Sequence, residues 1–118
     1  MTSEIRIVGE FTINEGKTEA FKELIKTAIE TVRSNEPDTL RYEFYFNEDE
    51  TACYPLELFR NSQAVLTHLE DVGAIVSKLS EVAQITRVEI YGNASDELKQ
   101  ALAPFGAKFF KHWGGFTR

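Results

Sequence analysis

The strongest constraint on the fold of this chain is the order in which two hydrophobic periods follow one another along it. Residues 5–13 place an apolar residue or glycine at every second position, which predicts a strand with one buried face. Residues 18–34 then carry apolar side chains at helical spacing, and Pro37 prevents that helix from continuing. A half-buried strand followed directly by an amphipathic helix indicates an α+β fold.

The same two periods recur along the rest of the chain. Residues 40–46 and 52–59 predict two strands joined by an acidic turn at residues 47–51. A second helix is expected from Ser62, which can cap it, and the helical spacing continues to residue 83 with a bend at Gly73. The remaining expected elements are a strand at 88–91, a short helix at 95–105 and a fifth strand at 107–112. The order is β-α-β-β-α-β with an appended helix and strand, which favours a ferredoxin-like antiparallel sheet with its helices on one face.

Size and charge limit the classes of function. The 118 residues are 42% hydrophobic, which predicts a single domain over residues 1–118, with a core at about 4–92 and an extension at 93–118. The net charge of −6 repels phosphate and anionic lipid, so we expect no nucleic-acid partner and no membrane partner. No apolar run approaches the ~20 residues of a membrane span, and no export signal is visible. The single cysteine, Cys53, lies in an apolar run, and together these features favour a cytoplasmic protein.

Several short motifs occur in an order that is typical of one family. The residues that carry them are Gly16, Lys17, Phe21, Glu36, Pro37, Tyr42, Glu57, Phe59, Ala64 and His68. This set resembles the antibiotic biosynthesis monooxygenase (ABM) family, which usually has Gly-Lys-x-x-x-Phe, Glu-Pro-Gly-x-x-x-Tyr, Glu-x-Trp and Ala-x-x-x-His in this order. Two positions depart from the pattern: Asp38 stands where the family has Gly, and Phe59 stands where it has Trp.

The resemblance implies both an assembly and a chemistry. It implies a homodimer in which two sheets pack into a dimeric α+β barrel, with an apolar cavity between the sheet and the helices of each subunit. It also implies oxidation of electron-rich phenols or quinols by dioxygen with no metal, flavin or haem cofactor, because a phenolate can itself give an electron to dioxygen. Such a site needs an apolar pocket, one base and a few hydrogen-bonding groups. We therefore expect a monooxygenase that acts on a small aromatic or quinol-type substrate.

Two polar residues are the candidate catalytic groups. His68 matches the family histidine and lies at the border of the apolar face of its helix, where it serves either as the base or as a boundary residue that caps the core. Glu57 lies in an otherwise apolar strand, so burial would raise the pKa of its carboxyl. The alternative for Glu57 is a salt bridge to Arg6, Arg41 or Arg60.

Aromatic residues complete the candidate site. The candidate substrate-binding residues are Tyr42, Phe44, Tyr54 and Phe59. Tyrosines are also common packing residues in strands, so that alternative stays open. His112 and Trp113 in the C-terminal tail are expected to form packing or dimer contacts. Two histidines and one cysteine without ligand spacing give no support to a metal site.

The sequence is also compatible with functions other than a monooxygenase. One alternative is a non-catalytic dimeric barrel that binds a small apolar molecule, for example in a stress response. It needs the same pocket but no base, and Phe59 in place of Trp favours it. An RNA-binding module shares the ferredoxin-like order, although the acidic charge opposes it. Haem degradation, known in one branch of the wider superfamily, is disfavoured because residues 5–13 contain no Asn and Phe59 replaces the Trp.

Overall fold

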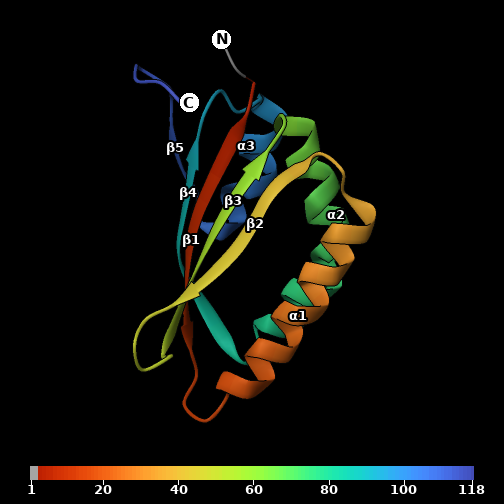
Figure 1. Cartoon of the computed structure of the whole chain (residues 1–118), viewed down its shortest axis with the longest axis vertical. Helices are drawn as coiled ribbons and strands as arrows, with labels where there is room; N and C mark the ends of the chain where they lie inside the picture. Colours follow the sequence, from red (N-terminus) through yellow and green to blue (C-terminus); the bar gives the residue numbers. More distant parts are fainter. Residues whose placement is uncertain (1–2) are drawn as a thin grey trace.

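The computed structural model describes residues 3–118 and confirms the ferredoxin-like α+β fold with its C-terminal helix and strand (Figure 1). The elements are β1 (Ile5–Ile13), α1 (Thr18–Asn35), β2 (Thr39–Phe46), β3 (Ala52–Phe59), α2 (Ser62–Leu79), β4 (Ala83–Tyr91), α3 (Asp96–Leu102), η1 (Ala103–Phe105) and β5 (Lys108–Phe110). The strand order is β2-β3-β1-β4-β5. The pairs β2–β3, β3–β1 and β1–β4 are antiparallel, and β5 runs parallel to β4. The three α-helices lie on one side of the sheet. The first two residues of the predicted domain lie outside the described residues.

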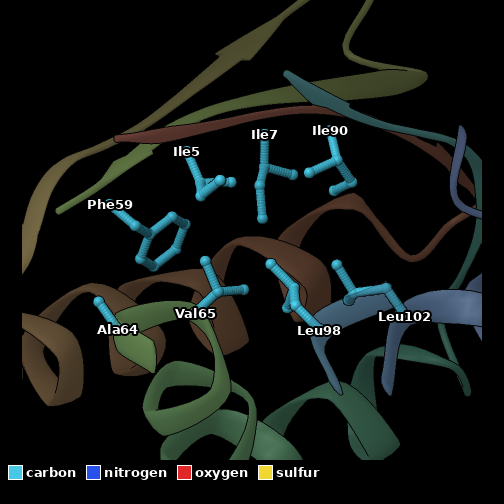
Figure 2. Close-up of a cluster of buried hydrophobic side chains, with 8 residues drawn as sticks. All are labelled: Ile5, Ile7, Phe59, Ala64, Val65, Ile90, Leu98 and Leu102. Carbon is cyan, nitrogen blue, oxygen red and sulfur yellow. The ribbon is translucent and has the colours of Figure 1, made fainter. Parts of the chain in front are cut away.

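The alternation along β1 decides which face of the sheet is covered. Its buried residues face the helices, and Figure 2 shows Ile5, Ile7 and Ile90 of the sheet pointing toward Val65 of α2 and Leu98 of α3. This cluster holds the end of the sheet where β1 begins. Ile5 and Ile7, the two residues that β1 contributes to this cluster, lie on the buried face that the sequence predicted.

A second cluster holds the other end of the sheet, where β1 finishes. Its centre is the fully buried Phe21 of α1, whose ring lies 5.3 Å from that of Phe11 and 6.2 Å from that of Phe46, both in edge-on geometry. Burial of a side chain of this size stabilises the fold by roughly 1.5–3 kcal/mol. Helix α2 is thus fixed to the sheet at both ends, and α1 is fixed at this end.

Helix α2 differs from the sequence-based prediction in two respects. It runs through Gly73 without interruption, so the predicted bend is wrong: the apolar spacing stays in phase across this position, and one glycine costs a helix only about 1 kcal/mol. Its cap is Asn61, whose side chain accepts a hydrogen bond from the backbone N–H of Ala64 at 2.9 Å. Ser62 instead accepts one from the backbone N–H of Ser95 at 3.0 Å, which ties the starts of α2 and α3 together.

Strand β4 starts earlier than predicted. Residues up to 83 continue a helical spacing, yet α2 ends at Leu79 and β4 already begins at Ala83, opposite Ile13. Pairing then skips one residue, because Phe11 lies opposite Ile85 whereas its neighbour Glu10 lies opposite Arg87. This bulge interrupts the alternation by which a strand is detected in a sequence. Pairing with β1 therefore sets the residue at which β4 begins.

The C-terminal extension packs against the rest of the chain through α3. Ser95 caps this helix by accepting a hydrogen bond from the backbone N–H of Leu98 at 3.1 Å, and Leu98 and Leu102 are buried in the first cluster (Figure 2). The fifth strand is confirmed but is shorter than predicted. Beyond it Trp113 is 98% exposed, so its predicted packing does not occur within this chain, and its role as a dimer contact stays a prediction.

The opposite face of the sheet carries no helix (Figure 1). Arg6, Val8, Arg41, Leu56 and Leu58 line a shallow cavity on this outer face. No helix in residues 3–118 is long and apolar enough to cross a membrane.

Candidate functional site

The candidate site is a cavity of about 120 Å³ between the sheet and the helices. Its wall is mostly apolar and comes from the strands β1 to β4, the helices α1 and α2, and the extension. Its polar side chains include Tyr42, Glu57 and His68, which lie together where β2, β3 and α2 meet. An apolar chamber with a few convergent polar groups is the usual form of a small-molecule site.

His68 is held by a residue at the end of α1. Pro37 stops that helix, so Glu36 becomes its C-terminal cap with non-helical backbone angles and turns its carboxyl inward. The carboxyl oxygens lie 2.9 and 3.2 Å from Nδ1 of His68. His68 and Glu36 are only 5% and 6% exposed, so water does not separate them from each other. One ring nitrogen is therefore committed to an internal partner.

The other ring nitrogen faces Glu57. Nε2 of His68 lies 3.6 Å from Oε1 of Glu57, on β3. Strand register sets this position, because Glu57 pairs with Tyr42 on one side and with Ile7 on the other, and all three line the cavity. The imidazole is thus flanked by two carboxyls, the buried Glu36 at Nδ1 and the largely buried Glu57 at Nε2.

The predicted alternative for Glu57 is wrong. Each candidate arginine pairs elsewhere: Arg60 with Asp38 at 2.9 Å, Arg41 with Glu43 at 3.7 Å and Arg6 with Glu4 at 4.0 Å. These pairs are exposed to solvent, whereas Glu57 points to the helix-covered side. None of these three arginines therefore neutralises the charge of Glu57, and His68 is the basic side chain beside it.

Aromatic rings fix the plane of the imidazole. The Tyr42 ring meets it edge-on at a centroid distance of 5.2 Å, and the fully buried Phe59 ring lies 5.1 Å away at an angle of 54°. Phe44 contacts Tyr42 edge-on at 4.9 Å and lines the cavity beside it. Packing on two sides leaves His68 little freedom to rotate, so its hydrogen bonds are preorganised.

Burial governs the electrostatics of this cluster. It raises the pKa of the Glu57 carboxyl, and the charge of Glu36 adds to this effect while His68 opposes it. It lowers the pKa of His68, although the charges of Glu57 and Asp71 act in the other direction. It also raises the pKa of the Tyr42 hydroxyl. Burial therefore favours the neutral form of each of these three groups.

Glu36 connects the cluster to the protein surface. Burial, and secondly a hydrogen bond that the protonated Glu36 carboxyl can donate to the neighbouring carboxylate of Asp71, raise the pKa of Glu36 from 4.5 to about 7, while a hydrogen bond of 2.7 Å donated by Thr39 works against the increase. Asp71 accepts a hydrogen bond of 3.3 Å from the exposed Asn35 side chain. A carboxyl with a pKa near neutrality, hydrogen-bonded to the histidine, is suited to pass a proton outward.

The structure brings most of the sequence-predicted site residues together. His68, Glu57, Tyr42 and Phe44 line one cavity, and Phe59 packs directly behind His68. Tyr54 lies apart, because it follows the buried Cys53 on β3 and pairs with the exposed Tyr45, which places it on the outer face of the sheet.

The sequence-based prediction missed Glu36 as a site residue. Its place in a Glu-Pro motif before a strand was visible, but only the folded chain shows its contact with a histidine far along the sequence. Within residues 3–118 no group of three or more His, Cys, Asp or Glu side chains is arranged to hold a metal ion, and we assign no metal ligand.

The family follows from a comparison with known proteins. The family model described as "Antibiotic biosynthesis monooxygenase" matches residues 4–72, which include β1, α1, β2, β3 and His68. The chain belongs to the antibiotic biosynthesis monooxygenase family. The resemblance inferred from the ordered motifs is thereby confirmed. A comparison with curated protein sequences found no match.

Solved structures show that the similarity to known proteins also covers the C-terminal segment. MupZ from Pseudomonas fluorescens is 31% identical, with a TM-score of 0.89 over 99% of this chain and 96% of its own. A conserved protein from Methanosarcina mazei Go1 is 23% identical (TM-score 0.65), covering 75% of this chain and 89% of its own. A protein from Caulobacter crescentus CB15, named as a candidate ABM, is 19% identical (TM-score 0.68), covering 75% of this chain and 88% of its own. The similarity to MupZ therefore includes the extension, whereas the two more distant proteins share a shorter part of the fold.

Proposed function

We propose that this ABM-family protein is a cofactor-independent monooxygenase that oxidises a small aromatic or quinol-type substrate with dioxygen. The observation that carries this proposal is the position of His68, whose Nε2 lies at the polar end of an apolar cavity while its Nδ1 is held by Glu36. A base fixed at the edge of a water-poor chamber is what phenol deprotonation requires.

His68 removes the proton of the substrate hydroxyl in this mechanism. Ionised Glu36 accepts the hydrogen on Nδ1, which leaves the lone pair of Nε2 available on the side of Glu57. Because burial lowers the pKa of His68, the ring is neutral before the reaction and able to accept a proton. When the imidazolium forms, Glu36 takes the Nδ1 proton, since its pKa lies near 7.

The phenolate then supplies the electrons. It gives one electron to dioxygen, and the resulting superoxide and phenoxyl radical combine at a ring carbon that carries hydrogen. Loss of water from the ring hydroperoxide leaves a quinone, so one oxygen atom enters the product and the other leaves as water. The protein binds and orients the ring, holds the proton and excludes bulk water. Tyr42 and Phe44, which line the cavity, supply the ring contacts, and the Tyr42 hydroxyl donates a hydrogen bond to the substrate in this mechanism.

The proposal is tested by oxygen uptake with a panel of hydroquinones and anthrones. We expect His68→Ala and His68→Gln to lower kcat by roughly 10²–10⁴-fold, the usual contribution of a general base. Glu70→Gln, an exposed change on the same helix, serves as the control with parental turnover. Equal turnover in the parent and both His68 variants would refute the role of the base.

Two other results would replace the proposed reaction. Conversion of a substrate at the same rate without dioxygen would mean that the buried carboxyls and His68 catalyse a redox-neutral proton transfer. Ligand binding that is independent of pH, without any turnover, would favour the non-catalytic barrel.

A homodimer is part of the same proposal. Val8, Leu56 and Leu58 place apolar groups on the helix-free face, between the charged pairs Arg6–Glu4 and Arg41–Glu43. A two-fold axis through such a mixed face can join opposite charges around an apolar centre. Sedimentation velocity should give the mass of two chains, and a stable monomer at micromolar concentration would contradict this assembly.

A further inference from the structure

A second cavity, of about 440 Å³, lies next to the first. The side chains that line both are Phe11, Val76, Leu79, Ile85 and Phe105. All five are apolar, so the boundary between the two cavities consists of hydrocarbon and aromatic surface. The two cavities are therefore neighbours that share part of one apolar wall.

The second cavity lies at the end of the site away from His68. Along α2 its wall begins at Val76, which is two turns or about 12 Å beyond His68. Along β1 it reaches Phe11, whereas the residue of β1 opposite Glu57 is Ile7. A molecule with its hydroxyl at His68 would therefore point its other end toward the second cavity.

The first cavity by itself has room for no more than about one ring. Its volume of about 120 Å³ is slightly smaller than the ~150 Å³ of an apolar protein cavity known to take up benzene. Sites for larger organic ligands usually measure ~300–1,000 Å³. The first cavity lies below that range, so a ligand larger than one ring at His68 must also use the second cavity, whose volume of about 440 Å³ lies within it.

Phe105 is the boundary residue best placed to control passage between the two cavities. It is the last residue of η1, where the left-handed Gly106 (φ 71°) ends the turn, and it belongs to the C-terminal extension. It is 38% exposed and is a member of neither hydrophobic core cluster, unlike Leu79 and the partly buried Phe11. Ile85 has a similar exposure (39%), but its side chain is smaller and its backbone is paired with Phe11 in the sheet. The Phe105 ring can therefore change rotamer without disturbing the core.

We propose that the two cavities form one elongated binding site, that the substrate carries an apolar chain on its ring, and that Phe105 sets how far this chain extends. The extension is thus the part of the molecule that selects substrates by length. This inference rests on the proposed function, because the ring is oriented by its hydroxyl at His68.

Binding of 4-alkylphenols, from methyl to hexyl, tests the proposal by titration calorimetry under anaerobic conditions. Each methylene that leaves water should tighten binding about fourfold, and in the parent protein this gain should continue through the longest chains. Phe105→Trp narrows the passage and should abolish the gain beyond propyl. Phe105→Ala widens the passage and should retain the gain. Phe110→Ala removes an aromatic ring of similar exposure (42%) from the same extension and should match the parent.

Length dependence decides this inference separately from the proposed reaction. If the parent gains nothing beyond propyl, or if Phe105→Trp and Phe110→Ala give the same length profile, the elongated site is refuted. If the length profile is as expected but His68→Ala oxidises 4-methylphenol as fast as the parent, the elongated site stands and the proposed base is wrong. Circular dichroism of each variant confirms that the fold is retained.

Discussion

Replacing Glu36 by glutamine should stabilise this protein, and only above acidic pH. The carboxyl is 6% exposed, and its pKa is raised from 4.5 to about 7 chiefly by burial. The raised value means that the folded protein holds the proton more tightly than the unfolded chain does. Glutamine has the same shape, does not titrate, and can keep hydrogen bonds to Nδ1 of His68 and to the hydroxyl of Thr39.

The size of the effect follows from proton linkage. Below pH 4.5 both states hold the proton, so ionisation costs nothing. Between pH 4.5 and 7 the unfolded chain releases the proton while the folded protein retains it, so the stability of the parent falls as the pH rises. Above pH 7 the accumulated loss is about 3 kcal/mol, at 1.36 kcal/mol for each pKa unit. His68 contributes the opposite slope, because its lowered pKa removes stability as the pH falls below 6.5, but both proteins contain it.

Urea unfolding at pH 5 and pH 8.5 measures this difference. We expect Glu36→Gln to exceed the parent by less than about 1 kcal/mol at pH 5 and by about 3 kcal/mol at pH 8.5. Circular dichroism is the suitable signal, because the only tryptophan, Trp113, is 98% exposed and reports poorly on the core. Glu70→Gln, on the exposed side of α2, should stay within about 0.5 kcal/mol of the parent at both pH values.

One result would refute the reasoning. If Glu36→Gln loses stability relative to the parent as the pH rises, Glu36 is an ionised carboxylate that stabilises a protonated His68. The two buried groups would then form an ion pair, and His68 would not be neutral before the reaction.

Three further outcomes are expected. Since ionised Glu36 is needed to orient His68, kcat/KM should rise with pH through about 7 and then level off, and a profile that is flat from pH 5 to 9 would contradict this. Tyr42→Phe should lower kcat/KM by roughly tenfold, the value of one hydrogen bond, while Tyr54→Phe on the outer face should match the parent; equal loss in both would show that the cavity is not the site. Gly92→Ala should lower the free energy of unfolding by about 2–4 kcal/mol, because the φ of Gly92 is 129° and a Cβ there would lie 2.6 Å from a backbone carbonyl oxygen. Gly73→Ala, in open space on α2, should instead raise the free energy of unfolding by about 0.5–1 kcal/mol. Thermal unfolding of both glycine variants checks the last expectation, and a stable Gly92→Ala protein would show that the strain is relieved by backbone movement.

Much of the architecture could be predicted because it depends on local periods. The alternation of residues 5–13 and the helical spacing of residues 18–34 are set by backbone geometry, which repeats every 2 residues in a strand and every 3.6 in a helix. Pro37 stops α1 wherever the rest of the chain lies, because it lacks the N–H that a helix needs. The order of elements and the family motifs follow from such signals.

The helix boundaries and the site depend on contacts between distant residues. The helical spacing of apolar residues from Ser62 to residue 83 is compatible with either a bent helix or a straight one. Only the pairing of Ala83 with Ile13 decides that β4 begins at Ala83. Tyr42 and Tyr54 both lie in strands of similar composition, yet sheet register sends one into the cavity and the other to the outer face.

By itself the sequence determined that this chain makes a ferredoxin-like α+β fold with a histidine at the edge of a helix face, since those properties are encoded within a few turns or strand residues. Only the tertiary structure decided that Glu36, one residue past α1, and Glu57, in the middle of β3, meet that histidine on its two nitrogens. The physical reason is that a hydrogen bond and a raised pKa depend on distance and on burial. Distance and burial are set when separate elements pack together, so they cannot be predicted from the local spacing of hydrophobic residues.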